Sequence, residues 1–368
     1  MLAARQPVAS GSMRVLLITN DYPPRPGGIQ QYLSNLVRYS EACIRVLAPA
    51  HPEAPEEPHV VRSRWAFMWP SARVRGWLGD RIGEFEPDVL LFGAPHPLAQ
   101  LGPRLSRTFG LPYVVMAHGA EVTLPGAVPG LRQLLGRTFR RASLVLAVSR
   151  YTARRVERLG ADRTTVLGAG VDLDTFSPGA STPGRDRPVV GCISRLVPRK
   201  GHLRVLAAAE RLSAAGTPVS VLLAGQGRLE GRLRNRAARA SVPVEIVTDA
   251  AWEELPDLYR SCDVFVMPAR SRWLGLEVEG LGIVYLEASA SGLPVIAGTS
   301  GGAPETVVPG VTGYVAVTTS QIVEGVGLAL ERRRELGAAA RARAEQHFSW
   351  ESVAGRLDAA LRRAVDGP

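Results

Sequence analysis

Lysine is almost absent from this chain of 368 residues: Lys200 is the only one, and the other 43 of its 44 basic side chains are arginine. Long apolar runs are absent too, because no stretch reaches the roughly 18 residues that a membrane-spanning helix needs. The N-terminus lacks the apolar core of a signal peptide, so we expect a cytoplasmic protein. Cys43, Cys192 and Cys262 are widely spaced, which predicts small core thiols in a reducing compartment.

Several catalytic signatures are also missing. The chain has no G-x-G-x-x-G motif followed by an acidic residue, which argues against a dinucleotide-dependent oxidoreductase. It also has no P-loop. No cysteine and histidine residues have the spacing of metal ligands, so we expect neither a metal site nor a cofactor.

Excess positive charge belongs to the first half of the sequence. Residues 1–170 contain 21 arginines and 12 acidic residues, whereas residues 171–368 contain 22 arginines, Lys200 and 22 acidic residues. The first half therefore carries +9 of the net charge of +10. Its candidate partners are nucleic acid, an anionic membrane surface or an acidic substrate.

Near-continuous Val/Leu/Ile runs, typical of strands buried on both faces of a parallel sheet, occur in both halves. They cover residues 13–19, 43–49, 88–94, 112–118, 143–149, 188–194, 219–225, 244–248, 263–268, 293–298 and 313–317. Helix-length segments separate them at 28–40, 97–109, 202–215, 229–240, 253–261, 284–291 and 303–308. This alternation predicts an α/β protein with two doubly wound, Rossmann-like domains.

The domain boundaries follow from composition. We expect a flexible tail at 1–12, a first domain at 13–176, a polar Gly/Pro-rich linker at 177–188 and a second domain at 189–347. Ligands of such sheets bind beyond the carboxyl ends of the strands. We therefore expect the site in a cleft where the two domains face each other.

Two motifs of the first half lie at predicted strand ends. Gly27 and Gly28 follow the first strand and lead into a helix, so their exposed amides form a possible anion seat. An ordinary turn would use the same glycines equally well. His118 ends the fourth strand before Gly119, where a structural and a catalytic role are equally compatible with the sequence.

The segment "SRLVPRKG" follows the first strand of the second half and contains three cations. Arg195 and Lys200 could converge on one diphosphate, the arginine as a planar fork and the lysine as a compact point charge. The simpler alternative for any one of these residues, Arg199 included, is a solvated basic turn.

Two carboxylates stand eight residues apart in "EVEGLGIVYLEASASGLPVIAGTSGGAPE" (277–305). Glu279 precedes a predicted helix that begins around Leu281, Gly282 and Ile283, and Glu287 lies on it. Such a pair, with the intervening amides, can hold sugar hydroxyls. Alternatively, Glu287 lies on a solvated helix face and Glu279 is a helix-end charge favoured by the dipole.

Residues 62–85 interleave arginine with aromatic side chains: Arg62, Arg64, Trp65, Phe67, Trp69, Arg73, Arg75, Trp77 and Arg81. In a helix over 71–85, an apolar face would contain Val74, Trp77, Leu78, Ile82 and Phe85. Such a helix could rest on anionic lipid, or it could pack its apolar face on the sheet.

Together the Gly-Gly turn, the Arg-x4-Lys pair and the Glu-x7-Glu motif resemble, in this order, the retaining GT-B glycosyltransferases of family 4. The resemblance covers about 13–365 and includes "HFSWESV" (347–353), which looks like the start of a terminal helix (348–368) that crosses back to the first domain. The motifs of the second half are similar to those of actinobacterial GDP-mannose-dependent transferases that add mannose to phosphatidylinositol monomannoside.

The resemblance implies a role for each matched residue. Gly27 and Gly28 would face the donor diphosphate, which Arg195 and Lys200 would neutralise without a metal. Glu279 and the amides of Leu281, Gly282 and Ile283 would hold the transferred mannose. Glu287 would reach the donor ribose, and His118 would lie beside the sugar and its acceptor.

The implied partners are GDP-mannose and an anionic inositol lipid at the inner leaflet, with peripheral membrane association through Arg62, Arg64, Trp65, Trp69, Arg73, Arg75, Trp77 and Arg81. Two departures matter: Ala120 stands where relatives have a second histidine, and Asp249 stands where they have glycine in the loop near the base. A UDP-sugar donor or a non-lipid acceptor therefore stays open. A nucleic-acid-binding protein is a more distant alternative, because no known nucleic-acid module is present and we expect no nucleic-acid partner.

Overall fold

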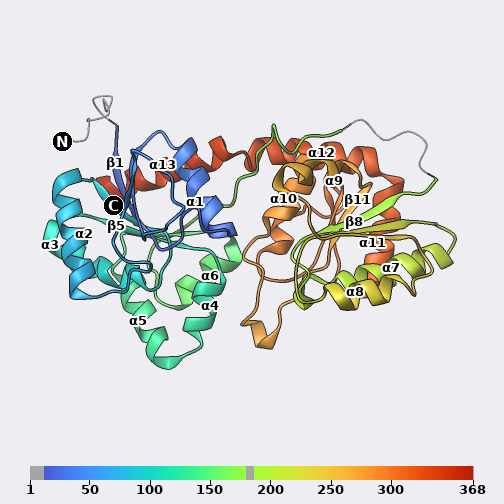
Figure 1. Cartoon of the computed structure of the whole chain (residues 1–368), viewed down its shortest axis with the longest axis horizontal. Coiled ribbons are helices and arrows are strands. Elements are labelled where there is room, and N and C mark those ends of the chain that lie inside the picture. The colour runs from blue at the N-terminus through green and yellow to red at the C-terminus, as the bar shows by residue number, and fades with distance from the viewer. Residues whose placement is uncertain (1–11, 180–185, 368) are drawn as a thin grey trace. The chain divides into compact units, whose positions relative to one another are not determined.

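The computed structural model describes residues 12–179 and 186–367. Residues 1–11 of the predicted tail (1–12) and residues 180–185 of the predicted linker (177–188) thus lie outside the described residues. The chain forms two compact units, one of residues 1–169 and 350–368 and the other of residues 170–349. Each unit contains one parallel sheet, and Figure 1 labels β1 and β5 in the first and β8 and β11 in the second.

The first unit holds a seven-stranded sheet in the order β3-β2-β1-β4-β5-β6-β7. Its strands are β1 (Arg14–Ile18), β2 (Cys43–Ala48), β3 (Val60–Arg62), β4 (Val89–Phe92), β5 (Tyr113–Ala117), β6 (Leu144–Ala147) and β7 (Thr164–Val166). Its helices are α1 (Gly28–Tyr39), α2 (Ala72–Phe85), the 3-10 turn η1 (Leu98–Leu101), α3 (Gly102–Phe109), α4 (Ala120–Gly126), α5 (Pro129–Arg140), α6 (Arg150–Arg158) and α13 (Trp350–Asp366). All the pairings are parallel, and strand order reverses between β1 and β4.

The second unit holds a six-stranded sheet in the order β10-β9-β8-β11-β12-β13. Its strands are β8 (Val189–Ile193), β9 (Ser220–Ala224), β10 (Val244–Val247), β11 (Val264–Met267), β12 (Val295–Ala297) and β13 (Gly313–Val315). Its helices are α7 (His202–Ala214), α8 (Glu230–Ala237), α9 (Leu255–Arg260), α10 (Ile283–Ala290), α11 (Thr319–Glu331) and α12 (Arg333–His347), with 3-10 turns η2 (Pro198–Lys200), η3 (Trp252–Glu254), η4 (Trp273–Gly275) and η5 (Ala303–Thr306). Both sheets confirm the predicted doubly wound fold.

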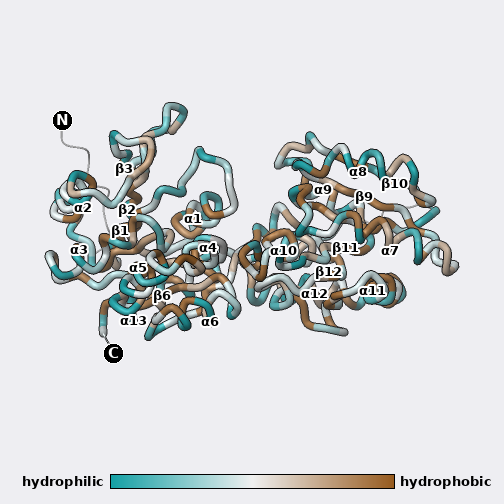
Figure 2. The backbone as a smooth tube through the Cα atoms, turned by 90° about the horizontal axis from the view of Figure 1, so that it is seen from below, coloured by the Kyte–Doolittle hydropathy of each residue, from teal (hydrophilic) through white to brown (hydrophobic). Residues whose placement is uncertain are grey.

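Apolar residues concentrate along the strands of each unit, and polar residues lie on the outer helices (Figure 2). The central strands β4, β5 and β6 are buried at every position, as expected for strands covered on both faces. Some helix starts carry a side-chain cap: the Ser71 hydroxyl accepts from the Val74 amide (3.2 Å) at α2, and Thr318 caps α11 through the Gln321 amide (3.1 Å).

The terminal helix α13 belongs to the first unit, as the resemblance implied. It packs on α1, and the buried Asp358 carboxylate accepts hydrogen bonds from the Ser40 hydroxyl and the Glu41 amide (2.9 Å). These bonds attach the last segment of the chain to the residues that follow α1, more than 300 positions earlier.

Helix α2 corrects one expectation. Its apolar residues Val74, Leu78, Ile82 and Phe85 lie in the core of the first unit, each no more than 4% exposed. Trp77 and Trp65 pack against the same core in an edge-to-face pair with ring centroids 6.1 Å apart. The interpretation that this apolar face rests on lipid is therefore wrong, because the face is already covered by protein.

The remaining members of the proposed membrane segment differ among themselves. Trp69 is 62% exposed, and Arg64 and Arg73 are exposed. Arg81 pairs with Glu84 on the same helix, and Arg62 donates to the Pro23 carbonyl (2.6 Å). The segment thus presents scattered exposed groups and not one continuous amphipathic face.

Candidate functional site

A buried ion cluster stands beyond the carboxyl end of β8 in the second unit. The Lys200 Nζ lies 2.8 Å from the Glu279 Oε2, and the Arg199 guanidinium donates to the same oxygen. Arg199 Nε also lies 3.6 Å from the Glu277 carboxylate. Arg199, Lys200 and Glu279 are each no more than 8% exposed. The fold thus brings together two residues of the basic turn and the first glutamate of the Glu-x7-Glu motif.

Charge pairing sets the protonation of this cluster. Burial would raise the pKa of the Glu279 carboxyl, but the charges of Lys200 and Arg199 and their hydrogen bonds lower it below its usual value. Burial lowers the pKa of the Lys200 ammonium, and Glu279 opposes that shift in part. Glu279 is therefore ionised at neutral pH, and its position depends on both cations.

Arg195 takes a different position from the other two cations. Its side chain is exposed, and among the described residues it forms no ion pair or hydrogen bond. Its charge nevertheless contributes to the lowered pKa of Lys200, so it lies near that ammonium. Arg199, which the sequence analysis left without a role, makes the contacts to Glu279 instead.

The loop around Glu279 is held by its backbone. The Glu279 amide donates to the Ser300 hydroxyl (3.0 Å), and its carbonyl accepts from the Gly302 amide (3.1 Å). Gly301 has φ +56°, and a Cβ at that position would lie 1.9 Å from the Glu279 carbonyl oxygen. Only glycine fits there, so the "GTSGG" segment fixes the direction of Glu279.

Helix α10 begins directly after this loop and leaves donors unused. The amides of Leu281, Gly282 and Ile283 donate to no acceptor among the described residues. Such unpaired amides at a helix start can donate hydrogen bonds to a hydroxyl oxygen or to an anion.

Glu287 lies on α10 and faces the interior. The Tyr259 hydroxyl donates to its carboxylate (2.6 Å), and the side chain is 6% exposed. Burial raises the pKa of Glu287 to about 7, although the Tyr259 hydrogen bond and the Lys200 charge oppose the shift. The alternative of a solvated helix face is therefore wrong. Tyr259 is a partner that the sequence analysis missed, because no local pattern places α9 beside α10.

The predicted site residues of the first unit follow the carboxyl ends of β1 and β5. Gly27 precedes α1 with φ +158°, and a Cβ there would lie 2.2 Å from Gln30 Oε1. Gln30 Nε2 in turn donates to the Asp21 carboxylate (2.8 Å). Gly28 is exposed at the first position of α1. The predicted Gly-Gly turn thus opens a helix of 12 residues.

His118 follows β5 and is held on two sides. Its Nε2 lies 2.8 Å from the Gly93 carbonyl, so this nitrogen carries the proton, and its ring meets Tyr32 edge-to-face at 5.3 Å. The Glu121 carboxylate accepts from the amides of His118 and Gly119. Burial raises the pKa of nearby Asp21, and the His118 charge opposes this. Asp21 and Glu121 are thus acidic neighbours that the sequence analysis did not assign.

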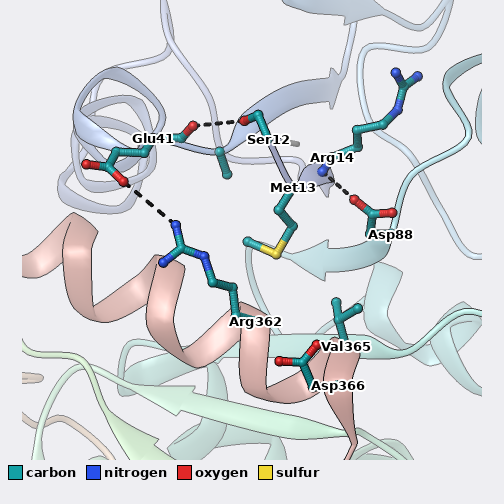
Figure 3. Close-up of a pocket in the computed structure, with 9 residues that line it drawn as sticks. Ser12, Met13, Arg14, Glu41, Asp88, Arg362, Val365 and Asp366 are labelled. Atoms are coloured by element: carbon teal, nitrogen blue, oxygen red, sulfur yellow. Dashed lines mark hydrogen bonds and ion pairs between the residues drawn. The ribbon is translucent and has the colours of Figure 1, made fainter. Parts of the chain in front are cut away.

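A separate pocket of about 640 Å³ lies at the amino ends of the strands of the first sheet, around the start of β1 (Figure 3). Several of its polar groups already have partners: the Arg14 amide donates to Asp88 (2.6 Å), and Arg362 lies 3.7 Å from Glu41. Because ligands of doubly wound sheets bind at the carboxyl ends of the strands, this pocket is not the candidate site.

Within 12–179 and 186–367, no three His, Cys, Asp or Glu side chains gather as a metal would require. No helix in that part of the chain is long and apolar enough to cross a bilayer.

Similarity to known proteins agrees with this arrangement. Residues 26–175 match the model of Glycosyltransferase Family 4, and residues 176–347 match that of Glycosyl transferases group 1. A GDP-mannose-dependent alpha-(1-6)-phosphatidylinositol monomannoside mannosyltransferase of Mycolicibacterium smegmatis is 39% identical over 372 residues, 93% of this chain and 97% of the relative. The corresponding enzyme for the monoacylated substrate in Corynebacterium glutamicum is 36% identical over 378 residues, covering 95% and 97%.

Solved structures show the same fold at lower identity. Sucrose-phosphate synthase from Thermosynechococcus elongatus aligns with TM-score 0.76 and 20% identity over 96% of this chain and 99% of its own. HepE from Anabaena, in complex with UDP, aligns equally well over 95% and 100%. By its two family models and its near-full-length relatives, this chain belongs to the family 4 glycosyltransferases of GT-B fold.

Proposed function

We propose that this chain transfers mannose from GDP-mannose to an anionic phosphatidylinositol mannoside, as a peripheral protein at the inner face of the cytoplasmic membrane. The support for donor and acceptor is the identity of 36–39% to enzymes with those substrates, over 93–95% of the chain. The support for a lipid acceptor is also electrostatic, since the first half carries +9 and basic residues are attracted to anionic leaflets.

The buried cluster of Lys200, Arg199 and Glu279 is the observation that carries the proposal. Removing ions from water costs free energy that their mutual attraction barely offsets, and apolar side chains would stabilise the fold at least as well. A cluster buried at a strand's carboxyl end is therefore better explained by ligand binding than by stability. A nucleotide sugar presents both of the groups that this cluster can recognise, a diphosphate and a ring of hydroxyls.

In this proposal each group has one task. Lys200 and Arg195 are the counter-charges of the donor diphosphate, and Arg199 holds the Glu279 carboxylate toward the mannose hydroxyls. The free amides of Leu281, Gly282 and Ile283 complete the sugar site, and Glu287 accepts from the donor ribose. In the first unit, the Gly27 and Gly28 amides serve the diphosphate and His118 serves the sugar and its acceptor.

The reaction needs placement and charge more than a nucleophile. The bond from the mannose anomeric carbon to the diphosphate oxygen breaks, and the acceptor oxygen bonds to that carbon from the same face, so configuration is retained. The acceptor proton passes to the departing phosphate oxygen. The positive charge that develops on the sugar is oxocarbenium-like, and fixed cations stabilise the leaving group. The proposal thus assigns to Lys200 and Arg195 the electrostatic role that a divalent ion has elsewhere.

Incubation with labelled donors tests the substrates. The protein is given GDP-mannose or UDP-glucose with a mixture of polar inositol lipids, and labelled lipid is measured. Label from GDP-mannose alone supports the proposal. Label from UDP-glucose alone would overturn the donor assignment, as the Asp249 departure allows. Donor consumption with a soluble acceptor and none with lipid would overturn the acceptor assignment.

A further inference from the structure

The positive charge of the first half is concentrated in one stretch. Residues 93–156 contain nine arginines and one acidic residue, Glu121. The rest of the first 170 residues contain 12 arginines and 11 acidic residues, and the segment 62–85 contributes only five arginines against two acids. The excess therefore lies on α3, α5 and α6 and not on the α2 segment.

Part of this charge lines one pocket. A cavity of about 390 Å³ lies between the η1–α3 segment and α5, which contacts η1; α3 and α5 are labelled in Figure 1. Its lining residues are Gln100, Pro103, Arg104, Arg107, Leu134, Arg137, Thr138 and Arg141. Four of these eight residues are arginines, and none of them is acidic.

These four guanidiniums have no counter-charge within the part of the chain that the structure describes. Arg104, Arg107, Arg137 and Arg141 are exposed and make no ion pair or side-chain hydrogen bond there. By contrast, the pocket of Figure 3 pairs each of its arginines with an acidic residue or a carbonyl. The helix dipole favours a cation in the last turn of α3 or α5, but it does not require four to gather around one hollow.

The pocket is also separate from the candidate active site. Thr138, one of its walls, accepts through its carbonyl from the hydroxyl of Tyr113, the first residue of β5 (2.6 Å). His118 lies beyond the other end of the same strand. The pocket therefore lies toward the amino ends of the strands, where the donor residues are not.

We propose that this arginine pocket binds a phosphate group. Guanidinium forks match phosphate oxygens bidentately, and two helices without acidic residues present them from both sides. The phosphate can come from the headgroup of an anionic phospholipid or from a soluble phosphate compound. The site does not depend on the proposed transfer reaction.

Two double variants of the full chain test this site. Arg107→Gln with Arg137→Gln removes two pocket cations, and Arg132→Gln with Arg154→Gln removes two exposed arginines that do not line it. Each is titrated with inorganic phosphate and co-sedimented with vesicles of phosphatidylcholine, with and without phosphatidylinositol. Because the donor site can also bind phosphate, the comparison is between the two variants of equal charge.

The pocket variant is expected to bind its ligand, inorganic phosphate or phosphatidylinositol vesicles, about tenfold more weakly than the control variant. This follows because each arginine contributes a factor of roughly five or less to the affinity. A loss on phosphatidylinositol vesicles identifies a lipid headgroup, and a loss only with inorganic phosphate identifies a soluble ligand. Equal binding by both variants to both probes would overturn the proposal. Arg107→Lys with Arg137→Lys keeps the charge without the forks, and full recovery by that variant would overturn the assignment of a shaped site.

Discussion

Lys200 and Glu279 stand 79 positions apart in the chain, yet their charged atoms lie 2.8 Å apart, almost out of contact with water. The pair joins the turn after β8 to the loop before α10. Any group that replaces Glu279 as partner of the ammonium must bring its own negative charge, as a diphosphate does. This relationship makes the basic turn and the Glu-x7-Glu motif parts of one site.

Arg199 is expected to stabilise this site as well as the fold. Arg199→Met leaves the buried Glu279 with one cation and should lower the free energy of unfolding by about 3 kcal/mol. Arg199→Met and Glu279→Gln each break the same ion pair, so the double variant should lose less than the sum of the single variants. Urea unfolding of all four proteins measures this coupling, and strictly additive effects would contradict it.

Glu287 should make stability depend on pH. Its pKa is about 7 in the folded protein against an ordinary 4.5, so between these values the folded state keeps a proton that the unfolded state loses. The contribution of Glu287 to the free energy of unfolding is therefore full below pH 4.5. It declines as pH rises toward 7, by about 3 kcal/mol at most.

Thermal unfolding from pH 4.5 to 8 checks this dependence. Glu287→Gln should flatten the decline and be relatively more stable than the parent at the alkaline end. Tyr259→Phe removes a hydrogen bond that lowers the pKa of Glu287, so the decline should extend to higher pH. A parent protein with the same profile as Glu287→Gln would refute the assignment.

Gly301→Ala is expected to displace Glu279, because the new methyl group would collide with its carbonyl oxygen and φ is +56°. We predict a loss of transferase activity and a lower midpoint of denaturation. Gly231→Ala is the matched control: this glycine lies on α8 with open space around it, and the change should stabilise by about 0.5–1 kcal/mol. Equal behaviour of the two variants would argue against a constrained loop.

Two of the three tryptophans in the 62–85 segment, Trp77 and Trp69, should distinguish a core position from a surface position. Trp77→Ala removes a ring that packs on the core and should cost about 2–3 kcal/mol of stability. Trp69→Ala, at a side chain 62% exposed, should cost under about 0.5 kcal/mol. Chemical denaturation distinguishes them, and an exposed, dispensable Trp77 would restore the lipid-facing interpretation of α2.

Much of the fold could be predicted because buried parallel strands are continuous apolar runs. All 11 predicted runs overlap strands of the two sheets. The strands β3 and β7 were missed, since each has three residues at the edge of its sheet and none is fully buried. Such short strands depend on a neighbour to pair with, which no local pattern reveals.

The site was predicted only in part, for a related reason. Motif spacing identified Lys200, Glu279 and Glu287 as candidates. It selected Arg195 and gave Arg199 no role, because the contact of Arg199 depends on how the 3-10 turn η2 directs it toward a residue 80 positions away. Tyr259 and Asp21 were missed because their partners, Glu287 and Gln30, come from other elements.

The central claim is that fixed positive charge at Lys200 drives departure of the nucleotide diphosphate. The most direct measurement is the single-turnover rate of mannose transfer from GDP-mannose for the parent, Lys200→Ala and the surface control Arg234→Ala, each with EDTA and with Mg²⁺. We predict a parent rate indifferent to EDTA, an unchanged control, and a rate about 100- to 1,000-fold lower for Lys200→Ala with its fold intact. A near-normal rate for Lys200→Ala, or a parent that stops in EDTA and recovers with Mg²⁺, would contradict the account.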